Sequence, residues 1–415
     1  MTKLNQLIKQ YGPPDALIDH WDTDSNRYAI WGFEEQFVIN YNGTAMINSA
    51  PSSGPAMEIW QNTLNQWKTD EKEISAVGYI SYDLKNILFP HIQFKRAEKI
   101  EPLLWFGKPD KIIPFDITES DELVPISQIK ISRDLPHPLE YEKSIHIIKE
   151  YLEKGDSYQI NLTQPKEYQI SGNPFDLYIS MREYIQPHYG MYMDTGNMQI
   201  LSFSPERFFQ SSNGIIESFP MKGTRPRSDD IIQDEHLAGE LYNSAKDRAE
   251  HLMIVDLIRN DIGKVCEYGS VDVENLFGIE SFETVHQMVS RVHGKLNKNI
   301  REIDIIQAMF PGGSITGAPK EQSMKIIDSL ENYQRGIYTG ALGSINSNGD
   351  LDFNIAIRTM TMEGKLATYP VGGGIVWDSD PLEEWQEAQQ KSRIIDMYQN
   401  NFFNDKSRLE SFLNI

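Results

Sequence analysis

The chain has 415 residues, and its 39 Lys and Arg against 60 Asp and Glu give it a formal net charge of −21. This charge disfavours a nucleic acid or an anionic membrane as a partner, and no apolar run approaches the ~18 residues of a membrane helix. One cysteine, Cys266, excludes an internal disulfide framework, and the N-terminal sequence lacks the apolar stretch of a signal peptide, so we expect a cytoplasmic protein.

The first 125 residues alternate short apolar runs with turn residues, which predicts strands of an antiparallel sheet at residues 28–33, 37–41 and 77–82. Between them, residues 57–67 (MEIWQNTLNQW) have helical spacing. Residues 114–138 are polar and contain several prolines, which is typical of a linker or domain crossing. We therefore divide the chain into an N-terminal region at 1–125, a main region at 140–395 and a C-terminal helix or tail at 396–415.

Helices and strands mix in the main region without regular alternation. Apolar residues at 141, 145, 148 and 152 predict a helix that ends at Gly155. Strands are predicted at residues 158–163, 198–203, 215–219, 338–345, 352–360 and 366–376. Further helices are predicted at residues 234–259, 303–310, 318–330 and 381–399. This order favours an α+β fold with large, mostly antiparallel sheets over a doubly wound fold.

The 381–399 helix carries a group of charged residues. Asp380 is a suitable N-cap, and Glu384, Glu387 and Lys391 share one face of the helix. The preceding strand reads VGGGIV at 371–376, and three glycines weaken a strand unless its backbone must approach another group closely. A solvated charged face and a ligand site lined by glycine backbone are both compatible with this pattern.

A second acidic pair, Asp247 and Glu250, lies on a helix whose other residues are mostly apolar. Such acids lie either at the rim of the fold or against a cation. Carboxylates from two helices, together with water, suit Mg²⁺, a hard ion that prefers oxygen ligands. Zinc is disfavoured, because the sequence contains neither an HExxH motif nor a cysteine cluster.

Residues 311–320 (PGGSITGAPK) resemble a phosphate-binding loop but lack its Lys-Ser/Thr pair. The loop can present backbone N–H groups to a carboxylate, or it can be a tight turn between helices. Lys222 lies between a predicted strand and a Pro-rich turn, where a lysine is most often solvated. We interpret Cys266 as a small buried hydrophobic residue. We interpret His286 and His293 as structural residues without a role in catalysis.

Taken together, these segments resemble one family, the chorismate-utilising enzymes, which include the anthranilate, aminodeoxychorismate, isochorismate and salicylate synthases. The resemblance rests on ordered segments over about residues 140–395, namely SYQINLTQ (157–164), SPERFF (204–209), PMKGTRPR (220–227), AEHLMIVDLIRND (249–261), MVSRVHG (288–294), PGGSITGAPK (311–320), RGIYTGALG (335–343), FNIAIRTM (353–360) and VGGGIVWDSDPLEEWQEAQQK (371–391). It implies a two-subdomain α/β sandwich around two large, mostly antiparallel sheets.

The resemblance also implies roles for individual residues. The matches to the metal-binding acids are Glu250 and Glu387, with Glu384 and Asp247 supporting, and the implied metal is Mg²⁺, which anchors the ring carboxylate of chorismate. The matches to substrate-binding positions are Tyr338, Arg358, Gly372, Gly374, Ser314, Thr316 and Lys391. The matches to catalytic positions are Lys222 and Glu206, of which Glu206 would protonate the departing C4 hydroxyl.

Two positions distinguish members of the family. Members that add water have a lysine where this chain has Gln159, and glutamine cannot deprotonate water. Anthranilate synthases resemble PIAGT where this chain has PMKGT, with Lys222 in place of alanine. With lysine at this position, the segment resembles that of the aminodeoxychorismate synthases. This branch of the family aminates C4 to give 4-amino-4-deoxychorismate, the precursor of 4-aminobenzoate and folate. Gln287 departs from the family pattern, which has histidine there.

The resemblance implies that ammonia comes from a separate glutamine amidotransferase subunit, because Cys266 is the only thiol and its context does not suit a nucleophile. Two alternatives stay open. One is anthranilate synthase component I, which Lys222 opposes. The other is a non-catalytic protein that binds chorismate or tryptophan, which the intact set of acids and Arg358 opposes.

Overall fold

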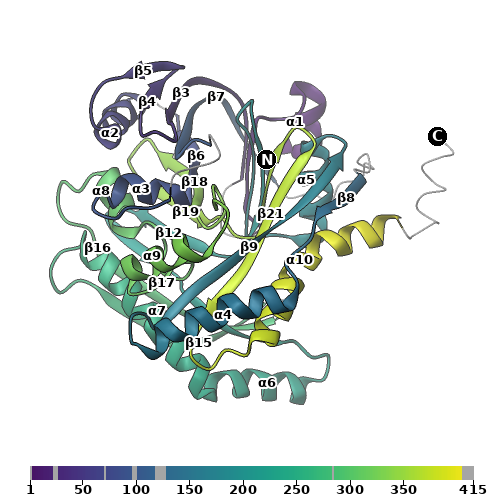
Figure 1. The fold of residues 1–415 in the computed structure, drawn as a ribbon. Coiled ribbons are helices and arrows are strands. Elements are labelled where there is room, and N and C mark those ends of the chain that lie inside the picture. The colour runs from purple at the N-terminus through teal and green to yellow at the C-terminus, as the bar shows by residue number, and fades with distance from the viewer. Residues whose placement is uncertain are drawn as a thin grey trace.

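A computed structural model describes residues 2–21, 27–69, 72–95, 101–116, 128–282 and 285–403. The helices in these ranges are α1 (Leu4–Tyr11), α2 (Ala56–Trp67), α3 (Lys85–Leu88), α4 (Pro138–Glu153), α5 (Pro174–Ile185), α6 (Ile231–Asn243), α7 (Ala245–Gly263), α8 (Glu302–Met309), α9 (Lys320–Leu330) and α10 (Pro381–Phe403) (Figure 1). None of these helices is long and apolar enough to cross a membrane. Residues 117–127 of the predicted linker and residues 404–415 of the predicted tail lie outside the described ranges.

Most predicted helices are confirmed, but the one at 234–259 is two helices, α6 and α7. The break is at Ser244, whose backbone is extended (φ −68°, ψ 110°). The Ser244 hydroxyl accepts a hydrogen bond from the Asp247 backbone N–H at 3.3 Å. A serine in this conformation caps the start of a new helix, so the chain turns between α6 and α7.

The strands are β1 (Thr2–Lys3), β2 (Ala16–Asp19), β3 (Tyr28–Ile39), β4 (Ala45–Ile47), β5 (Ala50–Ser52), β6 (Ile74–Ile80), β7 (Leu104–Asp116), β8 (Gln128–Arg133), β9 (Gln159–Ser171), β10 (Tyr189–Asp194), β11 (Gln199–Ser204), β12 (Arg207–Ser212), β13 (Ile215–Ser218), β14 (Met221–Pro226), β15 (Asp272–Ser281), β16 (Val285–Lys295), β17 (Gly317–Ala318), β18 (Ala341–Asn346), β19 (Leu351–Ile355), β20 (Thr359–Glu363) and β21 (Leu366–Ile375). The predicted strand at 352–360 is therefore two strands. The break includes Arg358, whose φ of +48° cannot continue a strand.

Apart from β1, which pairs parallel with β7, these strands pair antiparallel, in two connected layers. One layer runs β8–β9–β21–β20–β11–β10–β2, and the ladder continues from β2 into β3 and then through β7, β6, β18, β19, β12, β13 and β16. Buried residues from both layers meet in one cluster, among them Ile18, Val77, Met193 and Leu342. The expected α+β sandwich of large, mostly antiparallel sheets is confirmed.

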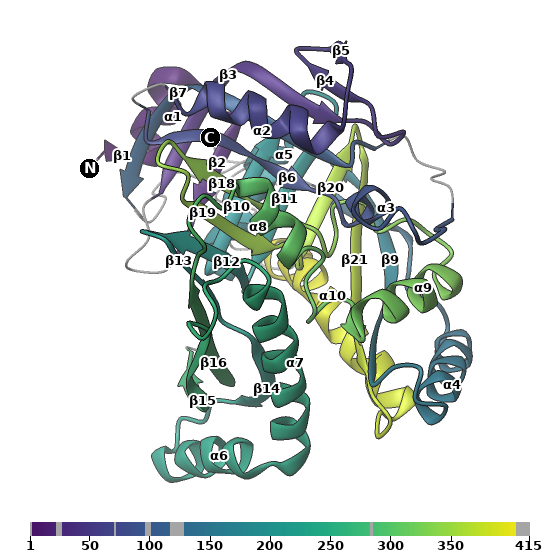
Figure 2. The same ribbon diagram turned by 90° about the vertical axis from the view of Figure 1, so that its left-hand side faces the viewer.

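Helices cover the outer faces of this sandwich. Helices α1, α5 and α10 pack on the layer with β9, β20 and β21, and helices α2, α7 and α8 pack on the layer with β6, β18 and β19. The second subdomain projects as an arm, which consists of β14, β15, β16, α6 and α7 (Figure 2). The arm faces the ends of β9 and β21 and the first turns of α10. Eight of the predicted site residues lie on the arm, β21 or α10, namely Asp247, Glu250, Lys222, Gly372, Gly374, Glu384, Glu387 and Lys391. The others lie on neighbouring segments, namely Glu206, Ser314, Thr316, Tyr338 and Arg358.

Candidate active site

Three consecutive glycines of β21, residues 372–374, line the candidate site with their backbone. Gly372 lies so close to β9 that a Cβ there would be 2.1 Å from the Leu162 carbonyl oxygen, so the strand pairing itself requires glycine. A Cβ at residue 374 would instead lie 2.9 Å from Gln159 Nε2 and 3.3 Å from Lys222 Nζ. The strand ends therefore bring the side chains of Gln159 and Lys222 together over the Gly374 backbone. The Gln159 amide is fully buried and has no hydrogen-bond partner within the described ranges.

Glu206 lies near this lysine, at the start of β12. Burial raises the pKa of Glu206 to about 7, although the charge of Lys222 and a hydrogen bond from Ser314 both lower it. The Ser314 hydroxyl donates to Glu206 Oε1 at 3.3 Å. A carboxyl group with this pKa carries a proton for much of the time at neutral pH, so Glu206 can act as an acid toward a leaving hydroxyl.

The charged face of α10 lies against Gly373. A Cβ at residue 373 would be 3.3 Å from Glu384 Oε2, 3.7 Å from Glu387 Oε1 and 3.7 Å from Lys391 Nζ. Lys391 Nζ contacts Glu387 Oε1 at 2.6 Å and donates to the Gly372 carbonyl at 2.9 Å. Because a side chain at residue 373 would fill the space against these head groups, the glycine run and the α10 charges form one structural unit.

The two acids of α10 have different electrostatic environments. Burial raises the pKa of Glu384 and outweighs a hydrogen bond from Ser379 Oγ at 2.6 Å. Burial also raises the pKa of Glu387, but Lys391, followed by Lys222 and Lys246, outweighs it and leaves that pKa below its usual value. Glu387 is therefore the acid of this pair that ionises at the lower pH.

On α7, burial raises the pKa of Glu250, and the charges of Asp247 and Glu387 raise it further against the opposing effect of Lys222 and Lys246. The carboxylates of Glu250 and Glu387 therefore interact across the two helices. Asp247 Oδ2 accepts from Arg225 Nη2 at 3.2 Å, so Asp247 is held by β14. Lys246 was not predicted from the sequence, although it lies one turn before Glu250 on the same helix.

The donor chemistry of these helices fits Mg²⁺. The described residues contain no group of three or more acidic, His or Cys side chains gathered around one point. Mg²⁺, however, needs only one or two carboxylates, because it keeps several waters. The repulsion that raises the pKa of Glu250 in the presence of Glu387 would be relieved by a bound cation. Glu250 and Glu387 are thus the acids that could hold it.

Residues expected to bind the substrate carboxylates lie on neighbouring segments. Tyr338 is buried, and Arg358 is exposed in the break between β19 and β20. Arg358 lies near Tyr369, whose buried hydroxyl has no hydrogen-bond partner within the described ranges. Burial raises the pKa of the Tyr369 hydroxyl, and the charge of Arg358 opposes this rise. Thr316 is fully buried, and its hydroxyl donates to the Gly312 carbonyl at 2.8 Å. In this arrangement Thr316 shapes its own loop, whereas Ser314 contacts Glu206.

The remaining sequence expectations concern the arm. Gln287 pairs with Thr224, next to the bulge that separates Thr224 from Lys222 in β14. His286 is structural, as expected, because its Nε2 lies 2.9 Å from Asp234 and its Nδ1 lies 2.8 Å from Ser281 Oγ. Sequence analysis overlooked His251, which neighbours Glu250 on α7. Burial and the Lys222 charge lower the pKa of His251 to about 4, so it is neutral.

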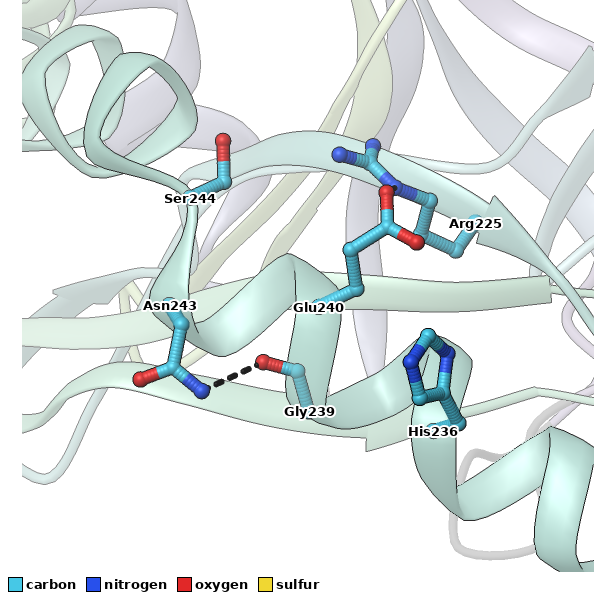
Figure 3. A pocket seen from close by; sticks show the side chains of 6 residues that line it. All are labelled: Arg225, His236, Gly239, Glu240, Asn243 and Ser244. Atoms are coloured by element: carbon cyan, nitrogen blue, oxygen red, sulfur yellow. Dashed lines mark hydrogen bonds and ion pairs between the residues drawn. The ribbon is translucent and has the colours of Figure 1, made fainter.

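A hollow of about 610 Å³ lies at the junction of α6 and α7 (Figure 3). Arg225 lies in it and donates to Glu240 Oε1 at 3.1 Å as well as to Asp247. The figure also shows Asn243, which donates to the Gly239 carbonyl at 2.7 Å. None of the predicted site residues lines this hollow, so we assign it to the packing of α6 against β14 and α7.

Known proteins resemble this chain in sequence and fold. Residues 118–396 match the family of chorismate binding enzymes. The chain is 37% identical over 332 residues to anthranilate synthase component 1 of Saccharolobus solfataricus, a match that covers 77% of this chain and 79% of that protein. It is 42% identical over 252 residues to aminodeoxychorismate synthase component 1 of Bacillus subtilis, a match that covers 61% of this chain and 54% of that protein.

The fold is similar to a crystal structure of anthranilate synthase component I from Streptococcus pneumoniae, with a TM-score of 0.77 and 25% sequence identity. That similarity covers 90% of this chain and 92% of the other. The solved structure therefore supports the fold, the family match supports chorismate as the ligand, and the names of the two kinds of relative differ in the product.

Proposed function

The chain belongs to the family of chorismate binding enzymes, and on that premise we propose that it aminates chorismate at C4. The product would be 4-amino-4-deoxychorismate, a precursor of 4-aminobenzoate and folate. Ammonia would come from a glutamine amidotransferase subunit, and Mg²⁺ would be required. The observation that carries this proposal is the position of Lys222, which lies beside Gln159 and the Gly374 backbone and near Glu206, whose pKa is raised by burial to about 7.

The reaction that this geometry supports has two steps. In the first, the neutral amine of Lys222 attacks C2 of the ring, the double bonds shift, and the C4 hydroxyl takes the proton of Glu206 and leaves as water. In the second, ammonia adds at C4, the double bonds shift back, and Lys222 leaves C2 as a neutral amine. The ammonium group formed at C4 returns a proton to Glu206. The net change is replacement of the C4 hydroxyl by an amino group, with release of water.

Other residues would hold the two carboxylates of chorismate. Glu250 and Glu387 would bind Mg²⁺, with Glu384 and Asp247 supporting them, and the ion would supply positive charge for the ring carboxylate. The fork of donors on Arg358, together with Tyr338 and the backbone N–H groups around Gly372 and Gly374, suits the enolpyruvyl carboxylate. Lys391 and Ser314 would add further contacts, and Thr316, whose hydroxyl donates to the Gly312 carbonyl, would shape the loop that carries Ser314.

Anthranilate synthesis is the second candidate, because a relative and a solved structure that each match most of this chain are anthranilate synthases. Amination at C2 has no need of a nucleophilic lysine over Gly374. Lys222 therefore favours the C4 reaction, and the identity of the product decides between the two.

The test is to incubate the protein with chorismate in the absence of ammonia. We expect a covalent adduct on Lys222, detected by intact mass and mapped to residues 220–227. Lys222→Ala should lose the adduct and reduce the 4-amino product by orders of magnitude, with little change in chorismate binding. Lys222→Arg should not restore activity, because a guanidinium stays protonated and cannot attack.

The matched control is Lys246→Ala, which removes a cation from the same acidic cluster but leaves the nucleophile. It should retain the adduct. Near-normal 4-amino product from Lys222→Ala would contradict the covalent role and favour direct attack by ammonia. Anthranilate as the main product of the unmodified protein would contradict the proposed C4 reaction.

A further inference from the structure

The buried guanidinium of Arg335 contacts segments of the chain that carry residues of the candidate site. Arg335, in the loop between α9 and β18, has a side chain that is 1% exposed. Arginine has five N–H donors, and all five are used here. Two of them, from Nε and Nη2, bind the carboxylate of Glu331, at 2.8 Å and 2.7 Å. The other three donors contact three separate segments of the chain.

Each of these segments carries a residue of the candidate site. Nη2 donates to the Asn161 carbonyl at 2.6 Å, on the strand that holds Gln159. Nη1 donates to the Ile315 carbonyl at 2.9 Å, between Ser314 and Thr316.

The third contact is from Nη1 to Thr339 Oγ1 at 3.2 Å, and the Thr339 hydroxyl in turn donates to the Tyr338 carbonyl at 2.6 Å. One side chain therefore sets the relative positions of β9, the 311–319 loop and the Tyr338 turn.

Glu331 makes this arrangement stable in a buried place. It balances the charge of Arg335 and also accepts from the Thr163 backbone N–H at 2.9 Å and the Thr163 hydroxyl at 2.8 Å. A buried charge without a partner is strongly destabilising, so each member of the pair depends on the other. Lysine could not replace arginine, because an ammonium has only three donors and no planar fork.

We propose that Arg335 is a positioning residue for chorismate turnover, which acts through the Asn161, Ile315 and Thr339 contacts and is held by Glu331. This inference rests on the proposed function only in that chorismate is the substrate; it does not depend on which carbon is aminated. Displacing substrate-binding groups by about 1 Å can cost about 100-fold in rate. We therefore expect Arg335→Lys to lower kcat/KM for chorismate consumption by about that factor, with a large share of the loss in KM.

The control is Arg182→Lys. Arg182 and Asp19 form a pair buried to the same degree, with side chains 4% and 0% exposed, and the pair is bidentate, with Nε and Nη2 both donating to Asp19. It touches none of the segments of the candidate site. Both variants should lower Tm. At a temperature well below either Tm, only Arg335→Lys should change KM and kcat.

A milder variant covers the case in which Arg335→Lys does not fold. Thr339→Val keeps the shape of the side chain but removes the hydroxyl between Arg335 and the Tyr338 carbonyl. It should raise KM for chorismate several-fold with little change in Tm. Unchanged KM in Thr339→Val, or equal losses of kcat/KM in Arg335→Lys and Arg182→Lys, would overturn the positioning role. These assays measure chorismate consumption, which does not depend on which product forms. A failure of the proposed C4 reaction would instead be seen when the product is identified, so the two failures can be distinguished.

Discussion

Two glutamates of the candidate site show how position sets the chemistry of a residue. Glu206 and Glu387 have the same side chain, and burial disfavours ionisation of both. Near Glu206 the opposing cation is Lys222, and the pKa still rises to about 7. Glu387 has Lys391, Lys222 and Lys246 nearby, and its pKa falls below the usual value. One group is thus suited to donate a proton and the other to bind a cation.

The pKa of Glu206 predicts a pH dependence for adduct formation on Lys222, measured without ammonia. Glu206 must carry its proton in order to donate it, whereas Lys222 must be neutral in order to attack, so the rate alone does not isolate Glu206. The ratio of the rate of the unmodified protein to that of Glu206→Gln should therefore decrease as pH rises through about 7, because both proteins need the same neutral amine. Glu206→Gln should slow the step by about 100-fold or more, since general acids contribute about 10²–10⁴ in rate. A ratio of the two rates that stays level from pH 6 to pH 9 would contradict this role.

The same pKa gives a control that does not depend on activity. When the pKa of a group is higher in the folded state than in the unfolded state, the protonated group stabilises the fold. This stabilisation is fully present below the unfolded-state pKa and is lost as pH rises through the folded-state pKa. Ionising Glu206 should therefore cost up to about 3 kcal/mol, because each pKa unit corresponds to about 1.4 kcal/mol. Glu206→Gln should be more stable than the unmodified protein at pH 8 and should lose that advantage near pH 5.

At the scale of elements, α7 and α10 present acids from opposite sides of the site. Local sequence explains each helix, because Ser244 caps α7 and Asp380 Oδ1 accepts from the Leu382 and Glu383 backbone N–H groups at the start of α10. The glycine run of β21 then lets the α10 side chains approach the strand, since a Cβ at residue 373 would be 3.3 Å from Glu384 Oε2. The site therefore depends on three elements that meet only in the folded chain.

This arrangement predicts that binding of Mg²⁺ requires both helices. Glu250→Gln and Glu387→Gln should each weaken the binding of Mg²⁺ in the presence of chorismate, measured by calorimetry, and each should abolish turnover. Excess chelator should abolish turnover of the unmodified protein. Loss of a carboxylate leaves fewer hard oxygen ligands for the ion, which is the physical reason.

Glu383→Gln is the matched control, because Glu383 lies on the same helix, one turn before Glu387, but is not one of the α10 side chains that lie against Gly373. It should bind Mg²⁺ as the unmodified protein does. Full turnover in excess chelator would show that the acids serve another purpose.

At the scale of the molecule, the candidate site lies between the arm and the sandwich, and the chain itself offers no thiol suited to release ammonia from glutamine. Cys266 is buried next to Gly294 of β16, and burial raises its pKa to about 11, so little thiolate is present at neutral pH. This supports a separate amidotransferase as the source of ammonia.

We expect ammonium salts at raised pH, where more of the salt is ammonia, to sustain turnover by the isolated chain. Glutamine should sustain turnover only after a glutamine amidotransferase subunit is added, and Cys266→Ser should change neither result. The measurement is 4-amino product against time with each nitrogen source. Glutamine-dependent turnover by the chain alone would contradict the need for a partner.

Local patterns in the sequence determined most of the elements. The periodic apolar residues of α2, α4, α8 and α9 predicted helices, because helix formation depends on contacts three and four residues apart. The spacing of Glu384, Glu387 and Lys391 likewise predicted a shared face, which the model places against Gly373. The resemblance of the ordered motifs predicted the fold and the substrate class, and both agree with the family match.

The tertiary structure alone decided which of these residues meet and how they ionise. Gln159, Lys222 and Gly374 come from distant parts of the chain, and their contact depends on the pairing of β9 with β21 and on the placement of the arm. The pKa of Glu206 and the contacts of Arg335 depend on burial and on neighbours far away in sequence. Sequence spacing reports neighbours along one helix or strand, whereas burial and long-range contacts arise only when the layers pack.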